Sequence, residues 1–125
     1  MIKEFVVRED DILYFSDITN DKNPLHIDEE YSKKGRFGKR VAHGMLILSY
    51  AVSIIGNHYP GNGTILLSIQ SNFKKPVYIN DRVKIDISKN KKIKNNIYEL
   101  TILCYNDNGE EVIDGKAIVL SNEVI

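Results

Sequence analysis

One segment of the chain, residues 43–58, reads HGMLILSYAVSIIGNH and is apolar on nearly every side of a helix. Its apolar run is too short to cross a bilayer, but it has the length of a helix in a globular protein. A surface helix carries a single apolar stripe, whereas a helix that is apolar all round has to be enclosed by other elements. The rest of this chain must therefore wrap around residues 43–58.

The residues after Gly63 are rich in β-formers and fall into four runs, 64–77, 81–92, 96–109 and 110–122. Val83, Ile85 and Ile87 alternate with polar or charged residues, which is typical of a strand with one buried face. Turn-forming residues separate the runs at 76–81, 94–96 and 106–109. Sequential antiparallel strands pair with their neighbours, so we expect a four-stranded meander.

The N-terminal part of the chain is less regular. Residues 2–7 alternate loosely and predict a strand, followed by a short helix that begins at Asp10 or Asp11 as N-cap. The spacing of Ile12, Phe15 and Ile18 would place these side chains on one face of that helix. Residues 19–41 predict an irregular segment, which a short helix near DEEYSKK would shorten. Irregular segments of this length in small domains are usually functional or disordered.

Together these elements predict one α+β domain over residues 1–125, in which an antiparallel β-sheet wraps around one long apolar central helix. This arrangement is the hotdog fold. A chain of 125 residues is long enough to bury a core without disulfides or a structural metal.

The charge and cysteine content exclude several functions. Seventeen Lys and Arg residues balance seventeen Asp and Glu residues, so no global field attracts nucleic acid or an acidic membrane surface. The single cysteine, Cys104, rules out an internal disulfide framework and favours a reducing compartment. The N-terminus lacks the apolar stretch of a secretion signal, and we expect a cytoplasmic protein.

The segment TNDKNPLHIDEE, residues 19–30, sets Asp21 five residues before His26 around Asn23 and Pro24. Its turn-forming residues fit an ordinary surface loop, and short motifs often match by chance. A stiff backbone could instead hold the carboxylate and the imidazole against one small volume, as an acid/base pair requires. Both interpretations stay open when this segment is taken alone.

The segment VAHGML, residues 41–46, opens the apolar helix. Gly44 falls in its first turn, where backbone N–H groups lack partners and the helix dipole is positive. A ligand oxygen could approach such a glycine closely, although Gly44 could equally serve close packing against the sheet. His43 fits a structural or capping role better than a catalytic one.

A basic run lies between these two segments, and it contains Lys33, Lys34, Arg36, Lys39 and Arg40. The run is either a solvated face or a site for the phosphates of a nucleotide-like carrier or for an acidic carrier protein. Too few aromatic residues accompany it to indicate nucleic-acid binding. His26, His43 and His58 lack the spacing of a metal site, and we predict no metal or cofactor.

The strings FSDITNDKNPLHIDEEY and FGKRVAHGML, taken together, resemble the MaoC-like dehydratases, in particular the (R)-specific enoyl-CoA hydratases with a single hotdog domain. The two strings at this separation, ahead of a buried helix, are far more specific than either one alone. The resemblance implies that Asp21 and His26 activate a water molecule and that Asn23 fixes the loop. It also implies that the N–H of Gly44 holds the thioester oxygen.

The activity implied is reversible hydration of a trans-2-enoyl thioester of CoA or acyl carrier protein to the (R)-3-hydroxyacyl thioester, in a homodimer and without a cofactor. We assign substrate binding to Asn23, to His43 and to the basic residues, which are Lys33, Lys34, Arg36, Lys39 and Arg40.

The chain departs from the family string at Thr19-Asn20, where Ser-Gly is usual, and asparagine is the residue that best replaces glycine at positive φ. Ser49 and Ser53 lie near the place where the family often has a helix serine.

The alternatives are a non-catalytic module that binds acyl thioesters and a hotdog thioesterase. The thioesterase would need a carboxylate within residues 43–58, and that segment has none.

Overall fold

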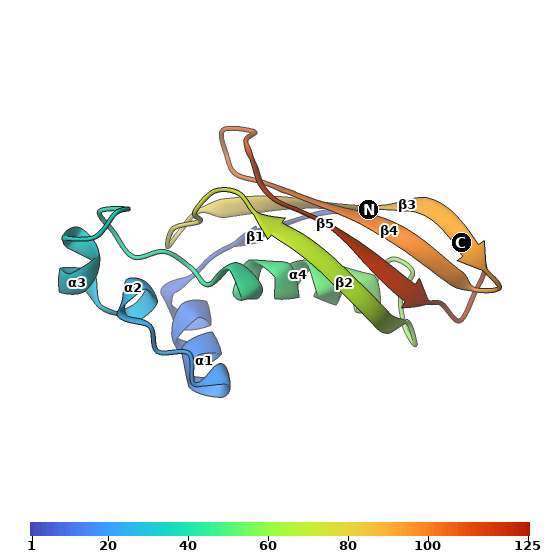
Figure 1. Cartoon of the computed structure of the whole chain (residues 1–125), viewed down its shortest axis with the longest axis horizontal. Helices are drawn as coiled ribbons and strands as arrows, with labels where there is room; N and C mark the ends of the chain where they lie inside the picture. The colour runs from blue at the N-terminus through green and yellow to red at the C-terminus, as the bar shows by residue number, and fades with distance from the viewer.

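A single long helix, α4 (Gly44–Asn57), lies along the inner face of a five-stranded antiparallel sheet in the computed structural model, which describes residues 1–125 (Figure 1). The strands are β1 (Ile2–Val6), β2 (Ile65–Phe73), β3 (Arg82–Lys94), β4 (Ile97–Tyr105) and β5 (Glu111–Leu120). Three shorter helices, α1 (Glu9–Thr19), α2 (Pro24–Ile27) and α3 (Glu29–Lys33), cluster at one end of the molecule (Figure 1).

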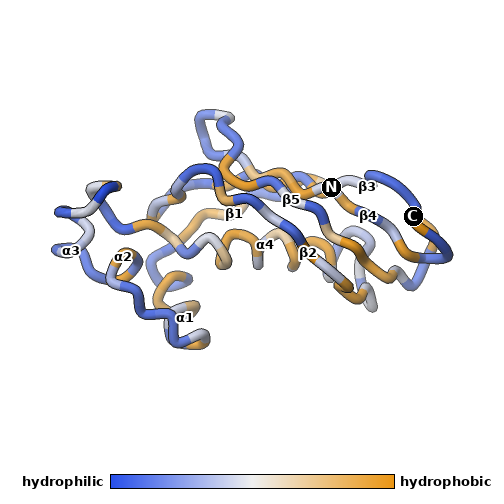
Figure 2. Tube along the Cα trace, in the orientation of Figure 1, coloured by the Kyte–Doolittle hydropathy of each residue, from blue (hydrophilic) through white to orange (hydrophobic).

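The core lies between α4 and the sheet. Ile47, Ala51 and Ile54 of α4 are buried, and they belong to one cluster of 21 buried apolar residues that also includes Ile85 and Leu100 of the sheet. The hydropathy of the trace follows the same division, with apolar residues concentrated where α4 and the strands face each other (Figure 2). The predicted α+β arrangement, a sheet around one apolar central helix, is therefore confirmed.

The sheet does not enclose α4 completely. Met45 is 55% exposed and Ser49 is also exposed, so one side of this apolar helix is uncovered in the single chain. The prediction that other elements surround the helix holds for its sheet-facing side and is wrong for this one.

The expected four-stranded meander is wrong at its first strand. The spatial order of the strands is β1-β3-β4-β5-β2, so β2 pairs with β5 and lies at the sheet edge. A strand has only two edges for hydrogen bonding, and those of β3 are taken by β1 and β4. The chain therefore crosses from β2 to β3 over the end of the sheet, and only β3, β4 and β5 form sequential hairpins.

The predicted turns after β3 and β4 are confirmed. Asn96 in the first has φ 55° and Gly109 in the second has φ 77°, the left-handed conformation that asparagine and glycine tolerate. In the second turn the side-chain oxygen of Asn106 accepts hydrogen bonds from the N–H groups of Asn108 and Glu110, both at 3.0 Å.

Two details of the predicted first helix are wrong. The helix begins at Glu9, and Asp11 does not precede it but accepts the N–H of Arg8 from inside the first turn, at 3.2 Å. Ile18 is 85% exposed, so the buried face of α1 is formed by Ile12 and Ser16 with Phe15 partly buried beside them.

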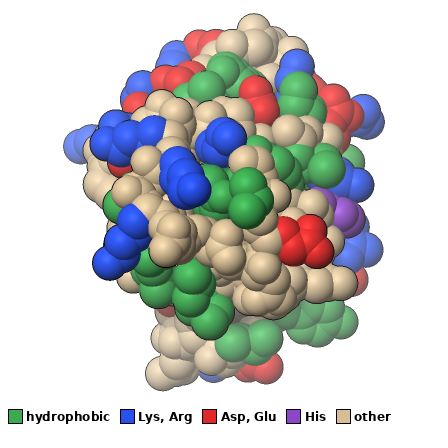
Figure 3. Space-filling model, turned by 90° about the vertical axis from the view of Figure 1, so that its right-hand side faces the viewer, with side chains coloured by type: hydrophobic (Ala, Val, Ile, Leu, Met, Phe, Trp, Pro, Cys, Tyr) green, Lys and Arg blue, Asp and Glu red, His purple; other side chains and the backbone are tan.

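The end of the molecule opposite α1, α2 and α3 carries a group of basic side chains. Four exposed lysines of β3 lie there, Lys89, Lys91, Lys92 and Lys94, and Figure 3 shows basic side chains gathered on this face. Positive charge is therefore concentrated at both ends of the molecule, and not in the run at 33–40 alone. None of the helices has the length and apolar content needed to cross a membrane.

The pairing of β5 with β2 leaves no room for a side chain at Gly115. A Cβ atom there would lie 2.6 Å from the carbonyl oxygen of Gln70. We predict that Gly115→Ala lowers the free energy of unfolding by about 1–3 kcal/mol, because the two strands must separate to admit the methyl group. Urea unfolding followed by circular dichroism measures this change.

Gly56→Ala is the matched control, because a Cβ atom at this helical position meets nothing within 4 Å. The same chemical change should there raise stability, by about 0.5–1 kcal/mol, through the helix preference of alanine. Equal stability of Gly115→Ala and the wild type would contradict the close packing of β2 against β5.

Candidate active site

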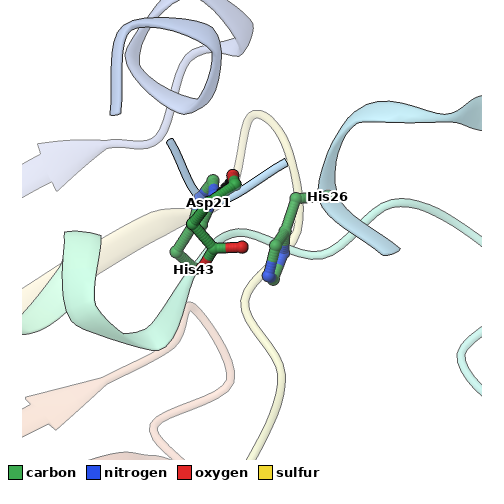
Figure 4. Close-up of side chains that lie close together, drawn as sticks. All are labelled: Asp21, His26 and His43. Atoms are coloured by element: carbon green, nitrogen blue, oxygen red, sulfur yellow. Dashed lines mark hydrogen bonds between the residues drawn. The ribbon is translucent and has the colours of Figure 1, made fainter. Parts of the chain in front are cut away.

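Three side chains from separate segments meet beside the first turn of α4 (Figure 4). Asp21 comes from the loop after α1, His26 from α2, and His43 is the N-cap residue of α4. One carboxylate oxygen of Asp21 and one ring nitrogen of each histidine lie within 4.8 Å of one another. The structure thus brings together the acid and the imidazole singled out in the sequence and adds a second imidazole to them.

Local hydrogen bonds hold Asp21 in place. Asn20 ends α1 in the left-handed conformation, with φ 60°, as its replacement of glycine predicts. The hydroxyl of Thr19 donates to the Phe15 carbonyl at 2.6 Å and accepts the N–H of Asp21 at 3.2 Å. The N–H of Asn23 then donates to the Asp21 carboxylate at 3.3 Å. The Thr19-Asn20 step therefore keeps a tight turn that presents the carboxylate.

The residues after Asp21 form a helix that the sequence interpretation missed. Asn23 caps α2, since its side-chain oxygen accepts the N–H of Leu25 at 3.1 Å, and Pro24 occupies the first helical position. Asparagine as N-cap followed by proline is a recognised helix start, so the signal was present in the sequence. The helix has only four residues, too few for an apolar periodicity to reveal it.

The hydrogen bonding of His26 defines its chemistry. The side chain is buried, and its Nδ1 atom lies 2.7 Å from the carbonyl oxygen of Val41. A carbonyl oxygen only accepts hydrogen bonds, so Nδ1 carries the proton and the Nε2 atom of the neutral ring holds a free lone pair. His26 is therefore arranged to accept a proton through Nε2.

His43 is packed against His26, with ring centroids 3.9 Å apart and planes inclined by 26°. Its Nε2 atom lies 3.0 Å from the hydroxyl of Ser16 and 3.3 Å from the carbonyl oxygen of Asp21. Burial lowers the pKa of His43 below its usual value, against the opposing effect of the Asp21 carbonyl, so the ring is neutral at pH 7. His43 supports the turn at Asp21 and the ring of His26.

Ser16 was not recognised as a site residue from the sequence. It is 4% exposed and lies four residues after Ile12 on the buried face of α1. A serine on an otherwise apolar face needs a hydrogen-bond partner, and this was the available signal.

The stacked geometry of the imidazoles is poor for holding a metal ion. A histidine binds a metal with a lone pair that lies in the plane of its ring. The two rings, with centroids 3.9 Å apart and planes inclined by 26°, therefore do not direct their lone pairs at one common point. The arrangement suits one imidazole that supports the other better than two ligands of one ion.

Gly44 is the first residue of α4, so its N–H has no partner within the helix. The ring of Phe73, from the end of β2, covers this glycine, and a Cβ atom at position 44 would lie 2.5 Å from the ring. Gly44 thus combines an available N–H donor with a contact that only glycine allows.

A cavity of about 350 Å³ opens next to these residues. His26 and Gly44 both line it, and most of the remaining wall is apolar. The lining residues that were not identified from the sequence include Phe37, Phe73, Lys74 and Lys75. Lys74 is held by Glu111 and by Asp114 at 3.0 Å, and Lys75 by Glu110, so neither lysine is free of a carboxylate partner.

The five residues of the basic run have different surroundings. Lys33 pairs with Glu30 at 3.2 Å, and the ammonium group of Lys39 lies 4.2 Å from the centre of the Tyr78 ring. Lys34 and Arg36 are exposed and have no carboxylate within 4.0 Å. Arg40 differs from all of them, because it is only 7% exposed and is paired with Glu9.

The two helix serines do not contact the acid or the imidazoles. Each hydroxyl donates to a carbonyl of its own helix, Ser49 to Met45 at 2.7 Å and Ser53 to Tyr50 at 2.6 Å. Neither serine is therefore added to the site.

The chain is similar to known proteins over most of its length. The chain is 32% identical to the 3-hydroxybutyryl-CoA dehydratase of Methylorubrum extorquens, over 90% of this chain and 72% of that protein. It is 38% identical to a mitochondrial 3-hydroxyacyl-(acyl-carrier-protein) dehydratase of Solanum lycopersicum, over 90% of this chain and 68% of the relative.

Among solved structures, the unliganded R-hydratase PhaJ1 of Pseudomonas aeruginosa superposes with a TM-score of 0.94 at 30% identity, covering 99% of this chain and 80% of that one. This likeness confirms the hotdog fold expected from the sequence. The family described as the MaoC like domain matches residues 2–102, which include both strings quoted above and every member of the site. The chain belongs to the MaoC-like domain family.

Proposed function

We propose that this chain is a hydro-lyase that adds water reversibly to a trans-2-enoyl thioester and forms the (R)-3-hydroxyacyl thioester. The observation that carries the proposal is that the Asp21 carboxylate lies within 4.8 Å of a ring nitrogen of His26, whose Nδ1 atom faces the Val41 carbonyl and whose ring lines a largely apolar cavity. The relatives named as dehydratases and as an R-hydratase support the same reaction type.

The groups present account for each proton in the reaction. A water molecule held between Asp21 and Nε2 of His26 loses a proton to one of them as its oxygen bonds to C3 of the substrate. The electron pair of the C2–C3 double bond moves toward the thioester, whose oxygen becomes negative. The proton is then delivered to C2, and both side chains return to their starting states. Dehydration follows the same path in reverse.

The N–H of Gly44 is positioned to stabilise the enolate oxygen. It is an unpaired donor at the positive end of α4, and it lines the cavity together with His26. One well-placed donor of this kind contributes about 3 kcal/mol to the stability of a transition state.

The carrier of the acyl group is proposed to be CoA or acyl carrier protein, since both occur in the names of relatives. Lys34 and Arg36 are the best candidates to contact its phosphates, because they are exposed and not neutralised by a carboxylate. Lys33 and Lys39 lie nearby in the same run and add to the positive field. Phe37, between them, lines the cavity and marks the side on which the carrier would enter.

We also propose that the protein is a homodimer that joins through β2. This strand lies at the sheet edge, with one side unpaired, and carries exposed large apolar residues at Ile65, Leu66, Leu67, Ile69 and Phe73. An open apolar edge favours pairing with another strand, and a second copy of β2 offers the same surface in a two-fold arrangement. Phe73 also lines the cavity, so the partner would approach the active site.

The proposal of a cytoplasmic location rests on composition. Cys104 is the single cysteine, and it is buried among core residues of β4, which leaves no thiol for an internal disulfide.

Asp21→Asn and His26→Ala should each lower kcat for the hydration of trans-2-enoyl-CoA by about 10²–10⁴-fold, because each removes a proton-transfer group. Loss of enoyl-thioester absorbance measures the rate, and circular dichroism checks the fold. Asp17→Asn and His58→Ala are matched controls, since both residues are exposed and outside the site. A wild-type rate in either site variant would refute these roles.

The wild-type protein decides between an enzyme and a binding module. Binding of enoyl thioesters without turnover, on CoA and on acyl carrier protein and across acyl chain lengths, would identify a non-catalytic acyl-thioester module.

Gly44→Pro tests the oxyanion donor against Gly44→Ala. Both variants add a Cβ atom that meets Phe73, but only proline removes the N–H, and proline is well tolerated at the first position of a helix. We predict that Gly44→Pro loses a further ~10²–10³-fold in kcat relative to Gly44→Ala. Equal rates for the two variants would show that the N–H of Gly44 is not used.

Sedimentation equilibrium should give twice the mass of the 14.3 kDa chain. Leu67→Lys combined with Ile69→Lys should shift the protein toward monomer, because charges on both copies would meet at the shared edge. Ile93→Lys replaces an exposed apolar strand residue on β3 and should leave the dimer intact. A dimer unaffected by the β2 variant would place the interface elsewhere.

A further inference from the structure

Arg40 is the one arginine or lysine of the chain whose residue is buried, at 7% exposure. A guanidinium group is always charged, so its burial is costly unless the charge is paired and hydrogen-bonded. The side chain pairs with Glu9 at 2.6 Å, and Glu29 lies 3.9 Å away. Glu9 opens α1 and Glu29 opens α3, so the guanidinium connects two helices that flank α2.

The same guanidinium reaches the backbone of the proposed catalytic histidine. The Nε–H of Arg40 donates to the carbonyl oxygen of His26 at 2.8 Å. The four-residue α2 offers little structure of its own to fix this residue. A planar group that binds Glu9 on one edge and the His26 carbonyl on another holds α2 at a fixed distance from α1.

Two further bonds join the same segments. The N–H of Val41 donates to the Leu25 carbonyl at 3.2 Å, and the Nδ1–H of His26 donates to the Val41 carbonyl at 2.7 Å. Residues 40 and 41 thus hold residues 25 and 26 through three hydrogen bonds. The N–H of Ala42 donates to Val77 at 2.7 Å and anchors the segment to the β2–β3 connection. Of these groups, the guanidinium alone reaches α1.

We propose that Arg40 is a positioning residue for His26, and that it is not a ligand for carrier phosphates. Through its bonds to Glu9 and the His26 carbonyl, it sets the direction of the lone pair on Nε2 of His26. The inference rests on the proposed role of His26 in hydration. It reassigns Arg40 from the group of substrate-binding cations, because its side chain is buried and its Nε and one terminal nitrogen are already bonded to the His26 carbonyl and to Glu9.

The charges around His26 give this role a measurable signature. The ring faces Asp21 and His43 directly, Lys74 and Lys75 share its cavity, and Glu9 and Glu29 act on it through Arg40. Removing the positive charge of Arg40 stabilises the protonated form of the His26 ring. The pH at which kcat falls to half its maximum on the acidic side, the pH midpoint, should therefore rise. Removing the Glu9 anion leaves the cation uncompensated, so the midpoint should fall.

The test compares kcat, KM and the pH profile of hydration for Arg40→Met, Arg40→Lys and Glu9→Gln. We expect Arg40→Met to lose at least about tenfold in kcat with little change in KM, and to shift the midpoint upward. Arg40→Lys keeps the charge but not the planar fork, so kcat should fall while the midpoint stays in place. Glu9→Gln, at a side chain that is 56% exposed, should fold normally and shift the midpoint downward.

Arg82→Met serves as the control, since it removes another arginine paired with a glutamate, Glu4 at 3.4 Å, far from the site. It should leave kcat, KM and the midpoint unchanged. Rates are taken per folded enzyme, measured by circular dichroism, so that loss of folded protein does not count as loss of positioning. The comparison of Arg40→Lys with Arg40→Met then separates the lost planar fork from the lost charge.

Three outcomes would overturn the inference. The first is a wild-type kcat and midpoint in Arg40→Met, and the second is a raised KM with unchanged kcat, which would assign Arg40 to the carrier. The third, decisive if Arg40→Met does not fold, is an unchanged midpoint in Glu9→Gln. Full activity in His26→Ala would instead refute the proposed function, whatever the Arg40 variants show.

Discussion

The burial of α4 against the sheet is the interaction on which the rest of the structure depends. Most of the surface of α4 is apolar, so the strands must cover its larger part, and the axis of the helix is then fixed relative to the sheet. The first turn of α4 lies where the sheet ends, beside α2 and the cavity. The burial of α4 against the sheet therefore also places the N–H of Gly44 and the ring of His43 at the site.

The sequence predicts a structural element correctly where its residue pattern has only one physical explanation. The apolar helix and the alternating strands could be predicted because burial imposes their periodicities, and the turns at 94–96 and 106–109 because positive φ demands asparagine or glycine. Asp21, His26 and Gly44 were found by a joint motif rather than by local statistics. The structure places Asp21 beside His26, and His26 and Gly44 at one cavity, and it has the turn at Asn20 that the motif requires.

What could not be predicted depends on contacts between distant segments. The position of β2 was missed because strand order is set by which edges remain free, and nothing within residues 65–73 records that the edges of β3 are occupied. Arg40 was grouped with its exposed neighbours because charge alone does not distinguish a solvated cation from one buried against Glu9. Ser16 and Phe73 reach the site from α1 and β2, with no spacing in the chain to connect them to His43 or Gly44.

The stacking of His26 on His43 makes the two imidazoles unequal. Burial lowers the pKa of His43, and the neighbouring ring of His26 lowers it further, since two cations at about 4 Å would repel each other by ~4 kcal/mol in a protein-like dielectric. His43 is held through its Nε2 atom by Ser16 and the Asp21 carbonyl, whereas the ring of His26 lines the cavity. One ring of the stack is thereby committed to structure, and the other is left to face a substrate.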